Sequence, residues 1–174
     1  MTSPVKGPTT ADRKAPLSRP VQVHDLPERG TDVTVEATAD ERAALARELG
    51  IPGIQSLVGT FHLSGTHRRV RVTGHVEANV TQVCVVTLDA FDSDVREEVE
   101  VDCAAPGLAE AAAGADPPDE IVDGSIELGA LTAEFLALGL PPYPRKPDVD
   151  FDYEVRDDKP ESPFAALDKL KRGG

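Results

Sequence analysis

Residues 116–147, with the sequence DPPDEIVDGSIELGALTAEFLALGLPPYPRKP, are the least generic part of the chain. Within them, large apolar residues recur at spacings of three, four and three positions, which is typical of one face of an α-helix. These residues are Leu128, Leu131, Phe135 and Leu138. Gly139 and the prolines after it end the helix. The pattern predicts a core helix over residues 128–138, packed across a sheet.

Before this helix, apolar and polar residues alternate, as they do in half-buried β-strands. The alternating segments are residues 20–24, 32–37, 54–66, 69–78, 81–90 and 95–104. Turns are expected at residues 65–68 and 92–94. Successive strands with short turns predict an antiparallel meander, and the pattern leaves open whether it closes partly into a barrel.

A second helix is expected over residues 39–49, because Thr38 and Glu41 have the spacing of a capping box. Gly50 and Pro52 follow it as stop signals. The predicted fold class is therefore α+β, an antiparallel sheet with one or two packed helices.

The chain of 174 residues is long enough for one domain with a real core. We expect a disordered basic tail over residues 1–18, a single α+β domain over 19–156, and a polar linker and C-terminal tail over 157–174. A last short strand is expected at residues 149–153, and a turn of helix at 164–170. Neither a secretory signal nor an apolar run long enough to span a membrane is evident, so a cytoplasmic location is expected.

The net charge is −13, so the overall field of the protein does not attract a phosphate backbone. The charges are nevertheless grouped. Arg68, Arg69 and Arg71 accompany His62, His67 and His75, and seven carboxylates follow between Asp89 and Asp102. Two interpretations are open: two solvated faces, or a bipolar module with a small basic face for RNA phosphate and an acidic edge for a basic protein.

The residues that could bind a metal or act in catalysis do not have the spacing that such sites require. No Cys or His pair has the close spacing that zinc requires, so no metal, cofactor or small-molecule substrate is expected. The carboxylates before the predicted core helix lack a partner that would mark a catalytic pair, so we do not expect an enzyme. Cys84 is expected to be a small buried core thiol. With a turn at 92–94, Cys84 and Cys103 would be near cross-strand neighbours, although a reducing compartment disfavours a disulfide.

The segment PPYPRKP, residues 141–147, places one aromatic and two cations in a stiff extended backbone. We expect Tyr143, Arg145 and Lys146 to contact an assembly partner, because tyrosine and arginine are typical of interface hot spots. The alternative is that Tyr143 packs on the sheet and the cations form surface ion pairs with Asp148 or Asp150.

Three blocks of the sequence together resemble the YceD family, the large ribosomal RNA subunit accumulation proteins, in its alphaproteobacterial form. They are DGSIELGALTAEFLALGLPPYPRKP, VTQVCVVTL followed by Phe91, and the terminal SPFAALDKLK. Where some members have Cys-x-x-Cys, this chain has Thr81 in place of the first cysteine. The resemblance implies a non-enzymatic factor for the accumulation or processing of large-subunit (23S) ribosomal RNA in ribosome assembly. A competing hypothesis is an acidic scaffold that binds a basic ribosomal protein without touching RNA, and a weaker one is a hydrolase or metal protein.

Overall fold

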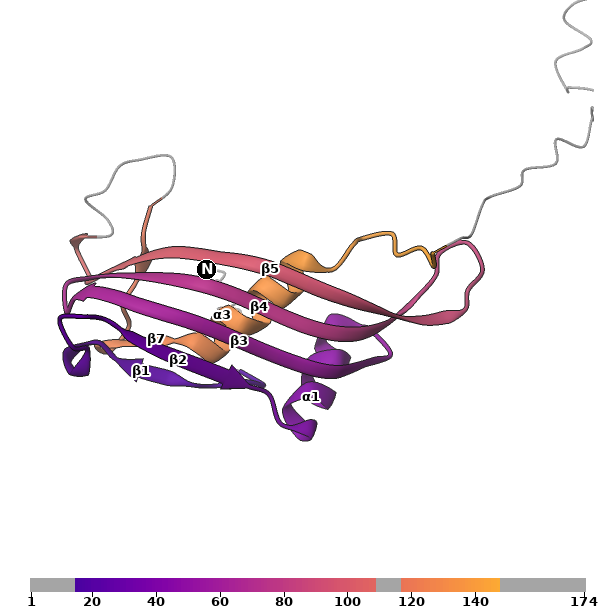
Figure 1. The fold of residues 1–174 in the computed structure, drawn as a ribbon, viewed down its shortest axis with the longest axis horizontal. Helices are drawn as coiled ribbons and strands as arrows, with labels where there is room; N and C mark the ends of the chain where they lie inside the picture. The colour runs from indigo at the N-terminus through magenta and orange to yellow at the C-terminus, as the bar shows by residue number, and fades with distance from the viewer. Residues whose placement is uncertain (1–14, 109–116, 148–174) are drawn as a thin grey trace, which may run out of the picture.

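The computed structural model describes residues 15–108 and 117–147, which form two sheets and two α-helices (Figure 1). The larger sheet has the strand order β2-β3-β4-β5-β6, and β1 pairs with β7 in a separate two-stranded sheet. The predicted α+β class with an antiparallel meander is confirmed, and the sheet is open rather than closed into a barrel. The elements are β1 (Pro20–Gln22), a 3-10 helix (Val23–Asp25), β2 (Thr31–Glu36), α1 (Ala39–Leu49), β3 (Gly53–Thr66), β4 (Arg69–Val83), β5 (Ala90–Ala104), β6 (Asp119–Glu120), β7 (Ser125–Glu127) and α3 (Leu128–Gly139).

Three long strands, β3, β4 and β5, make up most of the larger sheet, where four shorter ones were expected. The prediction of a turn at residues 92–94 is wrong, because β4 continues to Val83 and pairs with Ala90 across a turn at residues 84–89. Asp92 lies inside β5, and its carboxylate accepts a hydrogen bond from the Thr81 hydroxyl at 2.6 Å. A residue that is common in turns is thus held within a strand by a cross-strand partner.

The inner face of the sheet carries the core, as the alternation predicted. Leu57, Gly59, Phe61 and Leu63 of β3 are all buried, and so are Val70, Val72 and Val76 of β4. Helix α3 packs across this face at close range. A Cβ atom on Gly59 would come within 2.8 Å of the Thr132 hydroxyl and closer still to the Phe61 ring, so this contact requires glycine.

The predicted apolar stripe of α3 is only partly correct. Leu128 and Leu131 are buried, but Phe135 is half-buried and Leu138 is 69% exposed. Leu136 and Thr132 complete the buried face instead. Helix α3 runs diagonally behind the sheet and passes out across β5 (Figure 1), so the side that faces the core changes along its length.

The N-terminus of α1 is held as the sequence predicted. The Thr38 hydroxyl accepts the Glu41 amide at 3.4 Å, and the Glu41 carboxylate accepts the Thr38 amide at 2.8 Å. Gly50 adopts a left-handed conformation (φ 67°) and ends the helix. Arg19 adds a bidentate contact to Glu41, at 2.9 and 3.0 Å, and ties the start of β1 to this helix.

Several predictions lie outside the described residues, and they stay predictions. They concern residues 1–14 of the basic tail that was predicted over residues 1–18, the strand at 149–153, the linker from 157 and the helical turn at 164–170. In the described part of that tail, Leu17 is fully buried in the core. The proposed division into a tail, one domain and a C-terminal linker likewise stays a prediction.

Candidate functional site

One end of the β4–β5 hairpin is joined to the segment that follows α3. We call this assembly, residues 84–89 together with 140–147, the tip. The Val85 amide donates to the Pro144 carbonyl at 2.9 Å, and the Lys146 amide donates to the Cys84 sulfur at 3.4 Å. In Figure 1 the segment runs from the end of α3 to this turn. Two backbone contacts therefore fix where Tyr143, Arg145 and Lys146 are presented.

Cys84 is the centre of the tip rather than part of the sheet core. Its side chain is fully buried, but it does not belong to the main hydrophobic cluster. The Lys146 amide, then the Thr87 amide and hydroxyl and the Val86 amide, lower the pKa of the Cys84 thiol to about 6. Burial raises this pKa, but its effect is smaller than that of the hydrogen-bond donors together. The thiol is buried as expected, but it lies outside the main core and is acidic because N–H and O–H donors surround it.

Apolar side chains gather at the tip. Among the described residues, seven large hydrophobic side chains are exposed, and four of them belong to the tip or adjoin it. They are Val83, Val85, Leu88 and Tyr143, of which Leu88 is 77% and Tyr143 75% exposed. Leu88 also has a positive φ of 62°, which is unusual for a leucine. An exposed, strained leucine indicates a contact surface, and no feature of the sequence marks it.

The face of the sheet opposite α3 carries most of the strand charges, and we call it the open face. Glu77 of β4 binds Arg96 of β5, and Arg71 binds Glu100 at 2.6 Å and Asp102 at 3.8 Å. The carboxylates on the open face are Asp32, Glu36, Glu77, Asp92, Asp94, Glu98, Glu100 and Asp102, and the arginines are Arg69, Arg71 and Arg96. Because carboxylates outnumber arginines by eight to three, the open face is strongly acidic.

The six cationic or aromatic residues expected to bind a partner fall into two separate groups. Arg68, Arg69 and Arg71 lie at the start of β4, whereas Tyr143, Arg145 and Lys146 lie beside the turn at its other end. A strand of 15 residues separates the groups by roughly 45 Å. The structure therefore does not bring them together into one site. Of the five cations, Arg71 alone forms an ion pair with a described residue.

The expected proximity of Cys84 and Cys103 is wrong. Cys103 pairs with Val70 near the beginning of β4, and Cys84 follows the end of that strand. Both are free thiols at opposite ends of the hairpin. Burial, and then the carboxylates of Asp119 and Asp102, raise the pKa of Cys103 to about 11.

Among residues 15–108 and 117–147, no group of three or more His, Cys, Asp or Glu side chains is placed to hold a metal ion. Within the same residues, no helix has both the length and the apolar character to cross a membrane.

Residues 72–171 match the family model described as large ribosomal RNA subunit accumulation protein YceD. This chain belongs to the YceD family. Searches of curated proteins and of solved structures found no match. The family resemblance inferred from the sequence is thereby confirmed.

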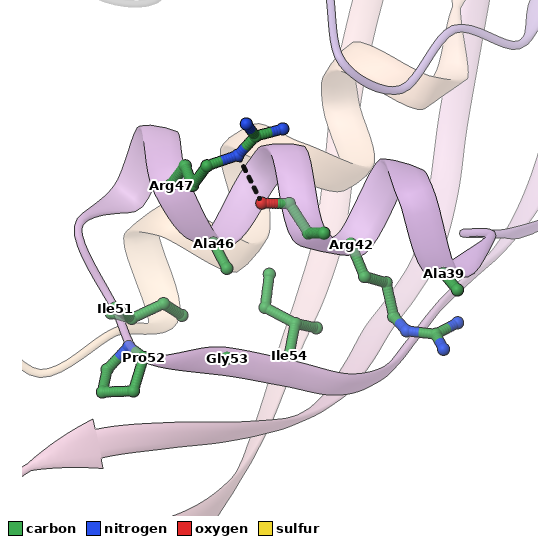
Figure 2. A pocket seen from close by; sticks show the side chains of 9 residues that line it. Ala39, Arg42, Ala46, Arg47, Ile51, Pro52, Gly53 and Ile54 are labelled. Carbon is green, nitrogen blue, oxygen red and sulfur yellow. Dashed lines mark hydrogen bonds between the residues drawn. The ribbon is translucent and has the colours of Figure 1, made fainter.

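The YceD match includes nearly all of β4, the tip, β5 and α3, whereas β1, β2, α1 and β3 precede it. A hollow of about 390 Å³ lies in this preceding part, between α1 and the start of β3 (Figure 2). Its two arginines bind backbone carbonyls nearby: Arg42 donates to Ala37 at 2.6 Å and Arg47 to Ala43 at 3.2 Å. The remaining lining is mainly Ala, Ile and Pro, so the hollow lacks converging polar groups that would select a ligand.

Proposed function

We propose that this protein is a non-enzymatic cytoplasmic factor that promotes the accumulation or processing of large-subunit (23S) ribosomal RNA during ribosome assembly. We further propose that its main contact is with a basic ribosomal protein, held on the open face, and not with RNA phosphate. The family description supports the first part. The observation that carries the second is the excess of carboxylates on the open face.

The physical reason is the sign of the local field. RNA phosphates would approach eight carboxylates, whose charge is offset by only three arginines on that face. Basic ribosomal proteins carry the complementary charge, and complementary potentials speed association and select the partner.

A second contact is proposed at the tip. Tyr143 is exposed, and neither Arg145 nor Lys146 forms an ion pair within the described part of the chain. Their backbone is fixed by the two contacts to the hairpin turn, so little ordering entropy is lost on binding. Arg68 and Arg69, at the opposite end of the sheet, form a smaller cationic group for the same role. The alternative, direct RNA contact, would use these two groups.

The role in ribosomal RNA accumulation is tested in a deletion strain. We expect the ratio of large-subunit to small-subunit ribosomal RNA to fall, more strongly in the cold, and to recover with the wild-type gene. An unchanged ratio at both temperatures would refute the role.

The open face is tested by complementation with Glu36→Lys combined with Glu98→Lys, two exposed carboxylates without a side-chain partner among the described residues. The matched control is Glu48→Lys with Glu134→Lys, which makes the same change in net charge on α1 and α3. We expect only the first pair to fail. Equal failure of both pairs would show that net charge matters and the face does not.

The tip is tested with Arg145→Ala combined with Lys146→Ala. The fold should survive, because only the backbone amide of Lys146 takes part in the contact with Cys84. We expect partial loss of rescue, and complete rescue would place the contact elsewhere. Treating a co-purifying partner with nuclease then separates RNA from protein, since a protein contact persists.

A further inference from the structure

The outer edge of β5 has a row of backbone groups whose direction the hairpin fixes. Two backbone hydrogen bonds of 2.9 Å close the two ends of the β4–β5 ladder, from the Cys84 amide to the Asp89 carbonyl and from the Ala105 amide to the Arg68 carbonyl. Between them the pairing runs without a shift. Because hydrogen-bonded and non-hydrogen-bonded pairs alternate in an antiparallel ladder, the even-numbered residues of β5 point their N–H and C=O groups away from β4.

At the Ala104 end of β5, outward backbone groups already have hydrogen-bond partners. The Ala104 carbonyl accepts the Ile121 amide at 2.8 Å, where the two-residue strand β6 joins the sheet. The parallel pairing of Cys103 with Asp119 also places the Asp119 amide at the Asp102 carbonyl. From Asp92 to Glu100 the outward groups have no backbone partner among the described residues. Figure 1 shows β5 as the outer long strand, with α3 behind the sheet and its C-terminal end crossing the edge of β5, where Gly139 packs against Val95 and Glu97. The edge of β5 is thus a template for one more strand.

The side chains of the same even-numbered residues lie on the open face, so the chemistry of the added strand can be inferred. Five of the six are carboxylates, and the sixth, Arg96, is paired with Glu77. Residues opposite each other in adjacent strands share a face, and opposite charges there are favourable. The even-numbered residues from 92 to 102 are Asp92, Asp94, Arg96, Glu98, Glu100 and Asp102.

The odd-numbered residues of β5 lie on the inner face, so they determine which side chains suit the inner side of an added strand. Val99 is buried and Val101 is half-buried on the inner face. Apolar residues at alternate positions of an added strand would lie next to Val101 and extend the inner layer. The edge therefore suits a strand in which basic and apolar residues alternate.

We infer that β5 binds an extended segment of a basic protein by antiparallel strand addition along residues 96–102. This rests on the proposed function for the identity of the partner, but the geometry of the edge does not depend on it. A second copy of β5 is a poor occupant, because two acidic rows would face each other. The chain's own segment DVDFDYEV, residues 148–155, has an acidic residue at every second position and is disfavoured for the same reason.

The probe for this inference is a short synthetic peptide of alternating lysine and valine. In an antiparallel added strand, lysines opposite the carboxylates form the hydrogen-bonded pairs, so their amides face β5 and the valine amides face away. N-methylation of the lysine amides should abolish binding, and N-methylation of the valine amides should leave it intact. The two methylated peptides have the same charge, so general electrostatic attraction cannot distinguish them.

Amide hydrogen exchange gives the position of binding. In the free protein the amides of Glu98, Glu100 and Asp102 should exchange fast, while those of Val99 and Val101 are protected by β4. With the unmodified peptide, the three even-numbered amides should slow by about tenfold or more. Glu98→Pro, which removes only an outward amide, should fold and lose peptide binding, whereas Glu98→Gln should retain most of it.

Equal binding of both methylated peptides without added protection would overturn strand addition and leave an electrostatic contact on the open face. Absence of binding by every peptide would also overturn it. In either case the role in ribosomal RNA accumulation is judged separately, by the deletion strain.

Discussion

The backbone amide of Lys146 donates a hydrogen bond to the sulfur of Cys84 at 3.4 Å, across 62 positions of the sequence. This contact and the neighbouring one between Val85 and Pro144 attach the proline-rich segment to the β4–β5 turn. The Lys146 amide, which helps to position the segment, also stabilises the thiolate form of Cys84. Docking of the segment and ionisation of Cys84 are therefore coupled.

We expect the two thiols of this protein to titrate far apart. Thiolate absorbance in the ultraviolet should rise in one step near pH 6 from Cys84 and in another near pH 11 from Cys103. Cys84→Ser should remove the acidic step only, and Cys103→Ser the alkaline step only. A single step near the ordinary thiol pKa would contradict the geometry of the tip.

Stability should depend on pH through Cys84. The pKa is lowered from 9.0 to about 6 in the folded protein, so between these values the unfolded state binds more protons. The stabilisation is full above pH 9 and is lost as the pH falls through 6. Denaturant unfolding of the wild type should therefore show a free energy that rises from pH 6 to 9 more steeply than that of Cys84→Ala.

Leu88 provides a test that separates stability from contact. A leucine at φ 62° is strained, by roughly 1–2 kcal/mol, and its exposed side chain contributes little burial. Leu88→Gly should therefore leave the free energy of unfolding unchanged or raise it by up to about 1 kcal/mol. If the tip contacts a partner, the same variant should weaken rescue of the deletion strain. Leu88→Val keeps an apolar side chain but adds β-branching, so it should destabilise; equal stability of the Val and Gly variants would argue against strain.

Glu41 should contribute to stability against acid. The Arg19 guanidinium, and then the Thr38 amide, lower the pKa of the Glu41 carboxyl from 4.5 to about 2. Its stabilisation is present above pH 4.5 and is lost as the pH falls toward 2. The free energy of unfolding of Glu41→Gln should lie below that of the wild type at neutral pH, and the difference should shrink between pH 4.5 and 2. Thr38→Ala, which removes only the cap, should cost about 1 kcal/mol.

Three alanine substitutions in α3 should have graded effects. Leu136 is fully buried, and Leu136→Ala should cost about 2–5 kcal/mol. Phe135 is half-buried, so Phe135→Ala should cost less than a fully buried phenylalanine would, below about 3 kcal/mol. Leu138→Ala should stay within about 0.5 kcal/mol. A large loss at Leu138, measured by denaturant unfolding, would show that this position is covered in the folded protein.

Local patterns gave a correct account of much of the fold. The capping box at Thr38 and the stop at Gly50 define α1 because their partners lie within a few residues. The alternation in residues 54–66 and 69–78 identified the buried face of β3 and β4, since the period of two is a property of the extended chain itself. The three sequence blocks likewise indicated the family correctly.

The position of the turn in the β4–β5 hairpin could not be predicted from the sequence. Residues 84–89, CVVTLD, have the composition of a strand, whereas the Asp-Ser-Asp run at 92–94 has that of a turn. The turn at 84–89 is held by the distant segment at Pro144 and Lys146, and Asp92 and Asp94 are held within β5 by Thr81 and Asn79.

By itself, the sequence determined the class of the fold, the helix boundaries and the buried alternation, because each depends on neighbours in the chain. Only the tertiary structure decided where β4 and β5 end, which charges share the open face and which edge stays unpaired. These features depend on register, and a change in the position of one turn alters every cross-strand partner beyond it. The acidity of Cys84 and the strain at Leu88 follow from that register, because both exist only where the chain turns.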